Sequence, residues 1–144
     1  MIWLLVAALF ILLVGVALWR FGFRAQQATG LPTGEVVYTD TGAWEQVPEP
    51  LLSHRYALVG KPDYLLRVCV GQRTTLVPVE VKSRRRPPVT PDSHILQLAT
   101  YCLLVEDVHK VRPAYGLLHY AAATLQIPYT DELRRAVLEV ADAI

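Results

Sequence analysis

The chain has 144 residues, of which 53% are hydrophobic, and its formal net charge is +1. Of its 14 basic residues, Arg20 and Arg24 flank an apolar N-terminal segment, so the remaining twelve nearly balance the 13 acidic ones. This near-neutral balance excludes binding to nucleic acid through overall charge and leaves only local clusters. Two cysteines, Cys69 and Cys102, exclude a four-cysteine zinc or iron–sulfur site. We expect both to be buried, reduced thiols unless an oxidising compartment lets them pair.

The N-terminal segment predicts a transmembrane anchor over residues 1–20. Residues 2–19 contain no charge, no proline and a single glycine. An 18-residue helix is about 27 Å long, which is enough for the hydrocarbon core of a bilayer. Trp3 and Trp19 stand at its two ends, where indole rings favour the interface. The arginines follow the segment, so the positive-inside rule predicts a single-pass membrane protein with a cytoplasmic C-terminal domain.

Two alternatives to an anchor stay open. A cleaved signal peptide needs a basic region before the apolar run and a small-residue cleavage site after it, and this chain has no basic residue before the run. A buried core helix is the other alternative, but such a helix is rarely apolar on every face.

The sequence predicts three regions: the anchor at 1–20, a linker and irregular lead-in at 21–50, and a folded domain at 51–144. Residues 25–35 carry Gln, Thr, Gly and Pro without periodicity, which is typical of a linker. Val36–Tyr38 is a candidate for a short strand, which the following TDTGAW and PEP stretches interrupt.

The first half of the domain predicts strands. Residues 54–60 alternate, Asp63–Val70 follows, and after a Gly71-Gln72 turn the segment Thr75–Lys82 is rich in valine. Together these three segments predict an antiparallel meander. The next segment, Arg84–Pro91, holds three arginines and three prolines, which is the composition of a loop.

The second half predicts a helix, two strands and a helix. Asp92 or Ser93 caps the first helix, which has apolar residues at helical spacing. These are Ile95, Leu98, Cys102 and Val105. Strand candidates at 115–120 and 125–129 come next, and Thr130 caps the last helix. Its apolar face carries Leu133, Val137, Leu138 and Ala141. This order of elements predicts a mixed α/β domain with one central sheet.

Asp63, Glu80 and Lys82 form a candidate catalytic cluster. Asp63 opens one predicted strand, and Glu80 and Lys82 lie two positions apart on the next, so these two side chains point to one face. If the strands pair, Asp63 approaches Glu80 within reach of one metal ion. Two carboxylates and a backbone carbonyl suit Mg²⁺ or Mn²⁺, which generates hydroxide from water and neutralises charge on a phosphate. The lysine can hold that water or stabilise the transition state.

The alternative for these residues is an ordinary solvated surface, and an E-x-K triplet alone carries little information. Glu80, however, lies inside the apolar run LVPVEVK. Strand interiors disfavour glutamate, and a carboxylate buried without a partner is costly. Such a conflict between local preference and position is typical of a functional site.

Asp63, followed after a hairpin by Glu80–Lys82, resembles the D…(D/E)xK signature of the PD-(D/E)XK nuclease superfamily. Gln97 and Tyr101, within HILQLATYCLLVE, form a Q-x-x-x-Y pair that resembles the RecB-like branch, most closely the CRISPR-associated RecB-like exonuclease family. The resemblance covers about residues 52–130 and includes LLSHRYALVGKPDYLL. It implies a restriction-endonuclease-like fold with a central mixed β-sheet flanked by helices, here preceded by one transmembrane helix.

The resemblance also implies roles for the matching residues around the metal. Asp63, Glu80 and the carbonyl of Val81 would bind Mg²⁺ or Mn²⁺. Lys82 would be catalytic together with the two carboxylates. The family usually carries an iron–sulfur cluster on four cysteines, and this chain, with two, is expected to have none.

The helix and the loop before it supply the residues expected at the DNA. Gln97 and Tyr101 lie four positions apart, share one helix face, and would contact DNA or orient the active-site residues. A solvated glutamine and a core tyrosine are the alternative. Arg84, Arg85 and Arg86 follow the catalytic strand and would hold the DNA backbone, with a solvated loop as the alternative.

Two histidines are weaker candidates. Many RecB-like members place a metal-binding histidine on a helix before the sheet, but this sequence predicts no such helix. His54 lies on a predicted strand, so the metal-binding role is not transferred to it. His94, near the helix start, could approach the substrate, but we favour an ordinary surface position.

The sequence therefore predicts a membrane-anchored, metal-dependent nuclease that hydrolyses DNA phosphodiester bonds with metal-activated water. The first alternative is a catalytically inactive nuclease-fold domain that binds DNA or a protein partner at the membrane. The intact cluster argues against that alternative, and the missing N-terminal helix argues for it. A small membrane adaptor is a further alternative, but it does not explain a glutamate inside a strand.

Overall fold

The computed structural model describes residues 1–3, 11–16, 32, 34–37 and 41–144. The chain divides into two compact units, Met1–Leu31 and Pro32–Ile144. In the first unit, the described residues Ile2–Trp3 and Ile11–Val16 are helical and exposed. The second unit holds the strands and the two longer helices described below.

The predicted transmembrane anchor over residues 1–20 is wrong. Among the residues that the structure describes, no helix is both long and apolar enough to cross a membrane. The rest of the predicted span, residues 4–10 and 17–20, lies outside the described residues. The same finding contradicts two further predictions. These are the single-pass membrane protein and the transmembrane helix in the predicted fold class.

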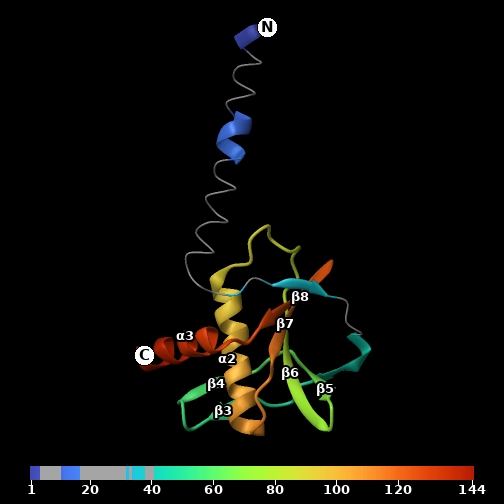
Figure 1. Ribbon diagram of the computed structural model, residues 1–144, viewed down its shortest axis with the longest axis vertical. Coiled ribbons are helices and arrows are strands. Elements are labelled where there is room, and N and C mark those ends of the chain that lie inside the picture. Colours follow the sequence, from blue (N-terminus) through green and yellow to red (C-terminus); the bar gives the residue numbers. More distant parts are fainter. Residues whose placement is uncertain (4–10, 17–31, 33, 38–40) are drawn as a thin grey trace. The chain divides into compact units, whose positions relative to one another are not determined.

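A six-stranded sheet organises the second unit, with the strand order β1-β8-β7-β6-β5-β2 (Figure 1). The strands are β1 (Glu35–Val37), β2 (Trp44–Gln46), β5 (Tyr64–Val70), β6 (Arg73–Val81), β7 (Tyr115–Tyr120) and β8 (Ala123–Pro128). Neighbouring strands are antiparallel except for the central pair, β6 and β7, which are parallel. Helix α2 (Asp92–His109) provides the crossover that a parallel pair requires.

The two faces of β6 differ because successive side chains of a strand alternate between faces. Val77 and Val79 are fully buried on one face, where Trp44 and Tyr64 partly cover them. The other face lies against α2 and carries Glu80. The strand therefore has an apolar core on one side and the candidate site on the other.

Pro78 lies inside this central strand, where a missing N–H would normally remove a ladder hydrogen bond. Backbone groups of alternate residues point to opposite neighbouring strands. The N–H of Lys82 points toward β7, since it donates to the carbonyl of His119 at 2.8 Å. Pro78 has the same parity as Lys82, and β7 pairs with β6 only from Val79 onward. The missing N–H therefore falls just outside the paired stretch.

A separate two-stranded sheet joins β3 (Leu51–Ser53) and β4 (Leu58–Gly60). The sequence predicts residues 54–60 as the first strand of a three-stranded meander, and this prediction is wrong. Residues 54–57 form a turn, in which Ala57 has a φ of 52°. The short hairpin packs against α2 instead of joining the larger sheet.

Helix α2 contacts both sheets and the last helix, so it is buried over most of its length. The predicted apolar face, Ile95, Leu98, Cys102 and Val105, is buried as expected. Its N-terminus differs from the prediction, because the N-cap is Pro91 and no side chain caps the helix. The carbonyl of Pro91 accepts the N–H of His94 at 3.0 Å. Asp92 instead lies in the first turn, where a negative charge favours the helix dipole.

Helix α3 (Asp131–Asp142) confirms the predicted cap, because Thr130 Oγ1 accepts the N–H of Leu133 at 3.1 Å. Leu133 is buried. Arg134 Nε donates to both carboxylate oxygens of Glu106 on α2, each at 3.1 Å. An apolar contact and an ion pair with a bifurcated hydrogen bond therefore hold α3 against α2.

The mixed α/β class and the order of elements from residue 63 onward agree with the sequence prediction. The edge strands β1 and β2 extend the sheet into residues 21–50, which the sequence predicts as a linker and lead-in. A 3₁₀ turn, η1 (Thr41–Ala43), precedes β2. Both cysteines are free, but only Cys102 is buried, so the expectation of a buried Cys69 is wrong.

The close approach of α2 to the sheet predicts that Gly116→Ala destabilises the fold. A Cβ at Gly116 would lie 2.6 Å from Cγ of Leu98 and 2.8 Å from its Cδ2, closer than real Cβ contacts allow. We expect a loss of about 1–3 kcal/mol in the free energy of unfolding, measured by urea denaturation.

The control is the pair of variants Leu98→Ala and Gly116→Ala/Leu98→Ala. If the clash causes the loss, the double variant will be more stable than the sum of the two single losses predicts. Simple additivity would contradict this explanation.

Candidate active site

The candidate site forms where β6 continues past the end of its partner β5. The paired register ends at Tyr64 opposite Val79, and β6 runs on through Val81. Asp63 immediately precedes β5, in the position that would lie opposite Glu80. Its Oδ2 accepts the N–H of Val81 at 2.8 Å, so a side chain takes the place of the next ladder bond. Pairing thus brings the two predicted carboxylates to one end of the sheet.

Four predicted residues meet between β6 and α2. Lys82 Nζ donates to Glu80 Oε1 at 3.0 Å and to Gln97 Oε1 at 2.8 Å. Gln97 Nε2 donates to Glu80 Oε1 at 3.0 Å and lies 3.0 Å from the hydroxyl of Tyr101, to which it also donates. The amide of Gln97 therefore links the lysine, the glutamate and the tyrosine. Figure 1 shows α2 running alongside β6 and β7, and it contacts both strands.

The electrostatics of the cluster centre on Glu80, which is 7% exposed. Burial raises the pKa of the Glu80 carboxyl, the hydrogen bond from Lys82 opposes this, and the negative charge of Asp63 raises the pKa further. Burial likewise raises the pKa of the Tyr101 hydroxyl. A cation between the carboxylates of Asp63 and Glu80 would relieve their mutual repulsion.

The donor set fits a hard divalent cation such as Mg²⁺ or Mn²⁺. Among the described residues, no three or more His, Cys, Asp or Glu side chains are grouped to hold a metal, so the side-chain donors are the two carboxylates. The N–H of Val81 points toward Asp63, and in an extended strand the carbonyl of the same residue points to the same side. Asp63, Glu80 and the Val81 carbonyl would thus hold the ion, with water and substrate completing its shell.

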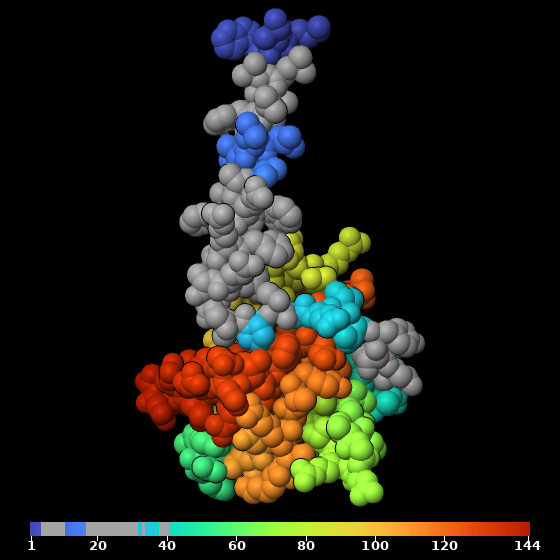
Figure 2. All heavy atoms as spheres, in the orientation of Figure 1, coloured from blue at the N-terminus to red at the C-terminus, as the bar shows by residue number. Residues whose placement is uncertain are grey.

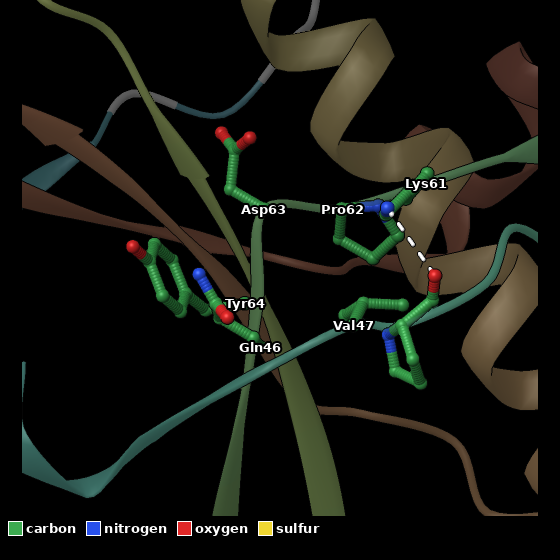
Figure 3. A pocket seen from close by; sticks show the side chains of 7 residues that line it. Gln46, Val47, Lys61, Pro62, Asp63 and Tyr64 are labelled. Carbon is green, nitrogen blue, oxygen red and sulfur yellow. Dashed lines mark hydrogen bonds between the residues drawn. The ribbon is translucent and has the colours of Figure 1, made fainter.

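A cavity of about 680 Å³ adjoins Asp63 on the side of β2 and β5. It is lined by Gln46, Val47, Pro48, Lys61, Pro62, Asp63 and Tyr64. Figure 3 shows the Asp63 carboxylate directed away from Val47, and the Lys61 ammonium donating to the carbonyl of Pro48 at 3.4 Å. The volume of this cavity lies within the range of small-molecule sites in proteins. A cavity with a mixed polar and apolar lining therefore lies directly beside one predicted metal ligand.

The three predicted arginines are all exposed, in the loop between β6 and α2. Nη2 of Arg84 lies 3.2 Å from His94 Nε2, so Arg84 has a fixed partner. The structure gives Arg85 and Arg86 no hydrogen bond or ion pair with another described residue. His94 has its second ring nitrogen, Nδ1, 2.9 Å from the hydroxyl of Tyr120. His94 is partly exposed, and its ring has two partners, which the expected surface position does not include.

The side chains of the other three histidines form no hydrogen bond with the cluster. His54 is exposed in the turn between β3 and β4, not on a strand as predicted. His109 is exposed at the end of α2. His119 Nδ1 lies 2.8 Å from Thr124 Oγ1, and its ring packs edge-on against Trp44. These three histidines supply no ligand to the candidate site.

The sequence prediction misses Lys61 and Tyr120, and only Lys61 carries a signal in the sequence itself. Lys61 stands in the quoted GKPD stretch, two positions before Asp63. Tyr120 ends a strand parallel to β6, so its place beside the end of β6 follows from the topology. The position of Tyr120 beside the end of β6 becomes apparent only from the pairing of β6 with β7.

No family model matches this chain, and no match was found among the curated proteins.

The cluster predicts that Lys82→Met makes the metal-free protein less stable, increasingly so as the pH rises. Lys82 lowers the pKa of the buried Glu80 carboxyl, so its removal raises the folded-state pKa further above the unfolded value. A raised carboxyl pKa means that stability is lost as the pH rises through it. We expect a deficit of about 1–3 kcal/mol near neutral pH that shrinks below about pH 4, measured by urea denaturation in EDTA.

Glu80→Gln/Lys82→Met is the control, because it removes the buried charge together with its partner. The pH dependence of the deficit should disappear in this double variant. A deficit that is equal at all pH values in Lys82→Met would show that lost packing, not charge, causes it.

Proposed function

We propose that this chain is a metal-dependent nuclease that hydrolyses phosphodiester bonds of DNA. The observation that carries the proposal is the convergence of Asp63, Glu80, Lys82 and Gln97 at the end of β6. These residues come from β6, from the turn before β5 and from α2. A lysine held between a buried carboxylate and an amide next to a second carboxylate suits charge stabilisation at a phosphate.

A bound Mg²⁺ or Mn²⁺ supplies a Lewis acid that activates water and offsets the charge that develops on the phosphate. The protein positions the groups around it. Gln97 fixes the ammonium of Lys82 through its Oε1, at 2.8 Å. Lys82 then donates to the attacking water or to a non-bridging phosphate oxygen and stabilises the negative charge of the transition state. Glu80 keeps this lysine on the α2 side of the strand.

The motif resemblance to RecB-like exonucleases supports DNA as the substrate class. The cavity of about 680 Å³ beside Asp63 offers space for a nucleotide next to the scissile phosphate. Tyr64, at its wall, has a half-exposed ring on which a base can stack.

A second candidate function is DNA binding without cleavage. It is favoured by one observation: the described residues before β5 contain short strands and a 3₁₀ turn but no helix that carries a metal-binding histidine. Loss of a second metal ligand would leave a domain that binds DNA through its arginines. The experiment below separates the two functions.

The proposed function predicts cleavage by the full chain with Mn²⁺ of labelled single- or double-stranded DNA, linear or circular. Lys82→Ala should reduce kcat by about 10²–10⁴-fold, because it removes the group that stabilises transition-state charge. Product formation is measured on denaturing gels, with EDTA as the metal-free reference.

Lys110→Asn is the matched control, because it also removes one lysine. Lys110 is exposed and is the C-cap of α2, where it has the left-handed backbone conformation that Asn tolerates. It should cleave like the wild type. No cleavage by the wild type, or equal cleavage by Lys82→Ala, contradicts the proposal. DNA binding without cleavage supports the second function.

A further inference from the structure

Arg84 is held at both its backbone and its side chain. Its carbonyl accepts the N–H of Ala121 at 3.1 Å, and its Nη2 lies 3.2 Å from His94 Nε2. The loop that carries it, residues 83–91, projects outward from the folded unit (Figure 2, yellow-green). An exposed arginine with a fixed orientation loses less conformational entropy when it binds a ligand than a free one does.

The hydrogen bonds define the protonation of His94. A guanidinium only donates, so His94 Nε2 must be the acceptor and the ring proton sits on Nδ1. Nδ1 lies 2.9 Å from the hydroxyl of the buried Tyr120, which accepts the hydrogen bond from the Nδ1–H group. His94 is therefore neutral, and a protonated ring would lose its bond to Arg84. Burial lowers the pKa of His94, and the charges of Lys82 and Arg84 lower it further, which favours the neutral form.

The contacts between Arg84, His94 and Tyr120 lie next to the candidate site. Arg84 follows Lys82 by two residues, and His94 precedes Gln97 by three on α2. Residues three apart on a helix share one face. The charged and titratable groups that face His94 are Lys82 and Arg84 from the end of β6 and its loop, and Tyr120 from β7.

We propose that Arg84 binds a DNA phosphate next to the scissile one, and that neutral His94, oriented by Tyr120, positions it. We call these three residues the arginine clamp. With one N–H engaged by His94, the guanidinium retains four donors for phosphate oxygens. The inference rests on the proposed function for its substrate and adds two positioning residues, His94 and Tyr120.

A double-mutant cycle tests the clamp, using the full chain and a labelled single-stranded oligonucleotide with Mn²⁺. We expect Arg84→Ala to raise KM about tenfold, with a smaller change in kcat. His94→Ala should raise KM about three- to fivefold, and the double variant should match Arg84→Ala alone, because His94 acts through Arg84. Additive effects of the two changes would overturn the positioning role of His94.

Arg73→Ala is the charge-matched control, because Arg73 is exposed at the opposite end of β6. A KM increase for Arg84→Ala no larger than for Arg73→Ala would overturn the clamp. Tyr120→Phe removes only the hydroxyl and guards against misfolding of His94→Ala, and it should raise KM about two- to threefold. An unchanged KM for a folded Tyr120→Phe would remove Tyr120 from the clamp.

The pH dependence gives a readout that a structural role alone would not move. As the pH falls through the lowered pKa of His94, which an NMR titration of its ring locates, His94 becomes protonated and releases Arg84. The ratio of KM for Arg84→Ala to KM for the wild type should therefore fall toward one. A ratio that stays constant across this pKa would overturn the requirement for neutral His94.

Failure of the proposed function can be told apart from failure of the clamp. If the wild type does not cleave, the same cycle is read as oligonucleotide Kd by fluorescence anisotropy. A preserved cycle in Kd without cleavage supports the clamp and rejects the nuclease. Normal cleavage with no selective effect of Arg84→Ala rejects the clamp alone, and a wild type that neither binds nor cleaves rejects both.

Discussion

The unequal pairing of β6 is the constraint on which the site depends. On one side β6 pairs with β5 only as far as Val79, and on the other it pairs with β7 through Val81. The last backbone groups on the β5 side thus have no strand opposite them, and Asp63 fills the first of these positions through its bond to Val81. Alternation of the side chains then sends Glu80 to the face covered by α2. Strand length and parity therefore place Asp63 and Glu80 at the same end of the sheet.

Glu80 is stable in this position only because its partners are complete. Burial of a carboxylate is costly, and here Lys82 and Gln97 both donate to the same oxygen. A buried polar network is favourable when all its members are satisfied and unfavourable when one is missing. The close approach of Leu98 to Gly116 sets the distance between α2 and the sheet, and hence the reach of Gln97. Core packing and site geometry are therefore coupled through one helix.

The sequence predicts the parts of the fold whose signal is local. Periodicity identifies β5, β6, β7 and α2 because each is long and bounded by turns or prolines. The strands β2, β3 and β4 have three residues each, too few for a period, and only tertiary pairing defines their bounds. The edge strand β1 is equally short, but it overlaps the strand candidate at Val36–Tyr38. Glu80 stands out because a charge interrupts an apolar strand. The partners of His94 do not stand out, since they require the parallel register of β6 and β7.

One face of α2 positions both Lys82 and Arg84. His94, Gln97 and Tyr101 follow one another at helical spacing, so α2 presents one polar stripe to the end of β6. Gln97 fixes Lys82, and three residues earlier His94 fixes Arg84. A rigid helix cannot shift one of these contacts without shifting the other. The cationic groups therefore keep a constant spacing along β6 and its loop, as the proposed binding of neighbouring DNA phosphates would require.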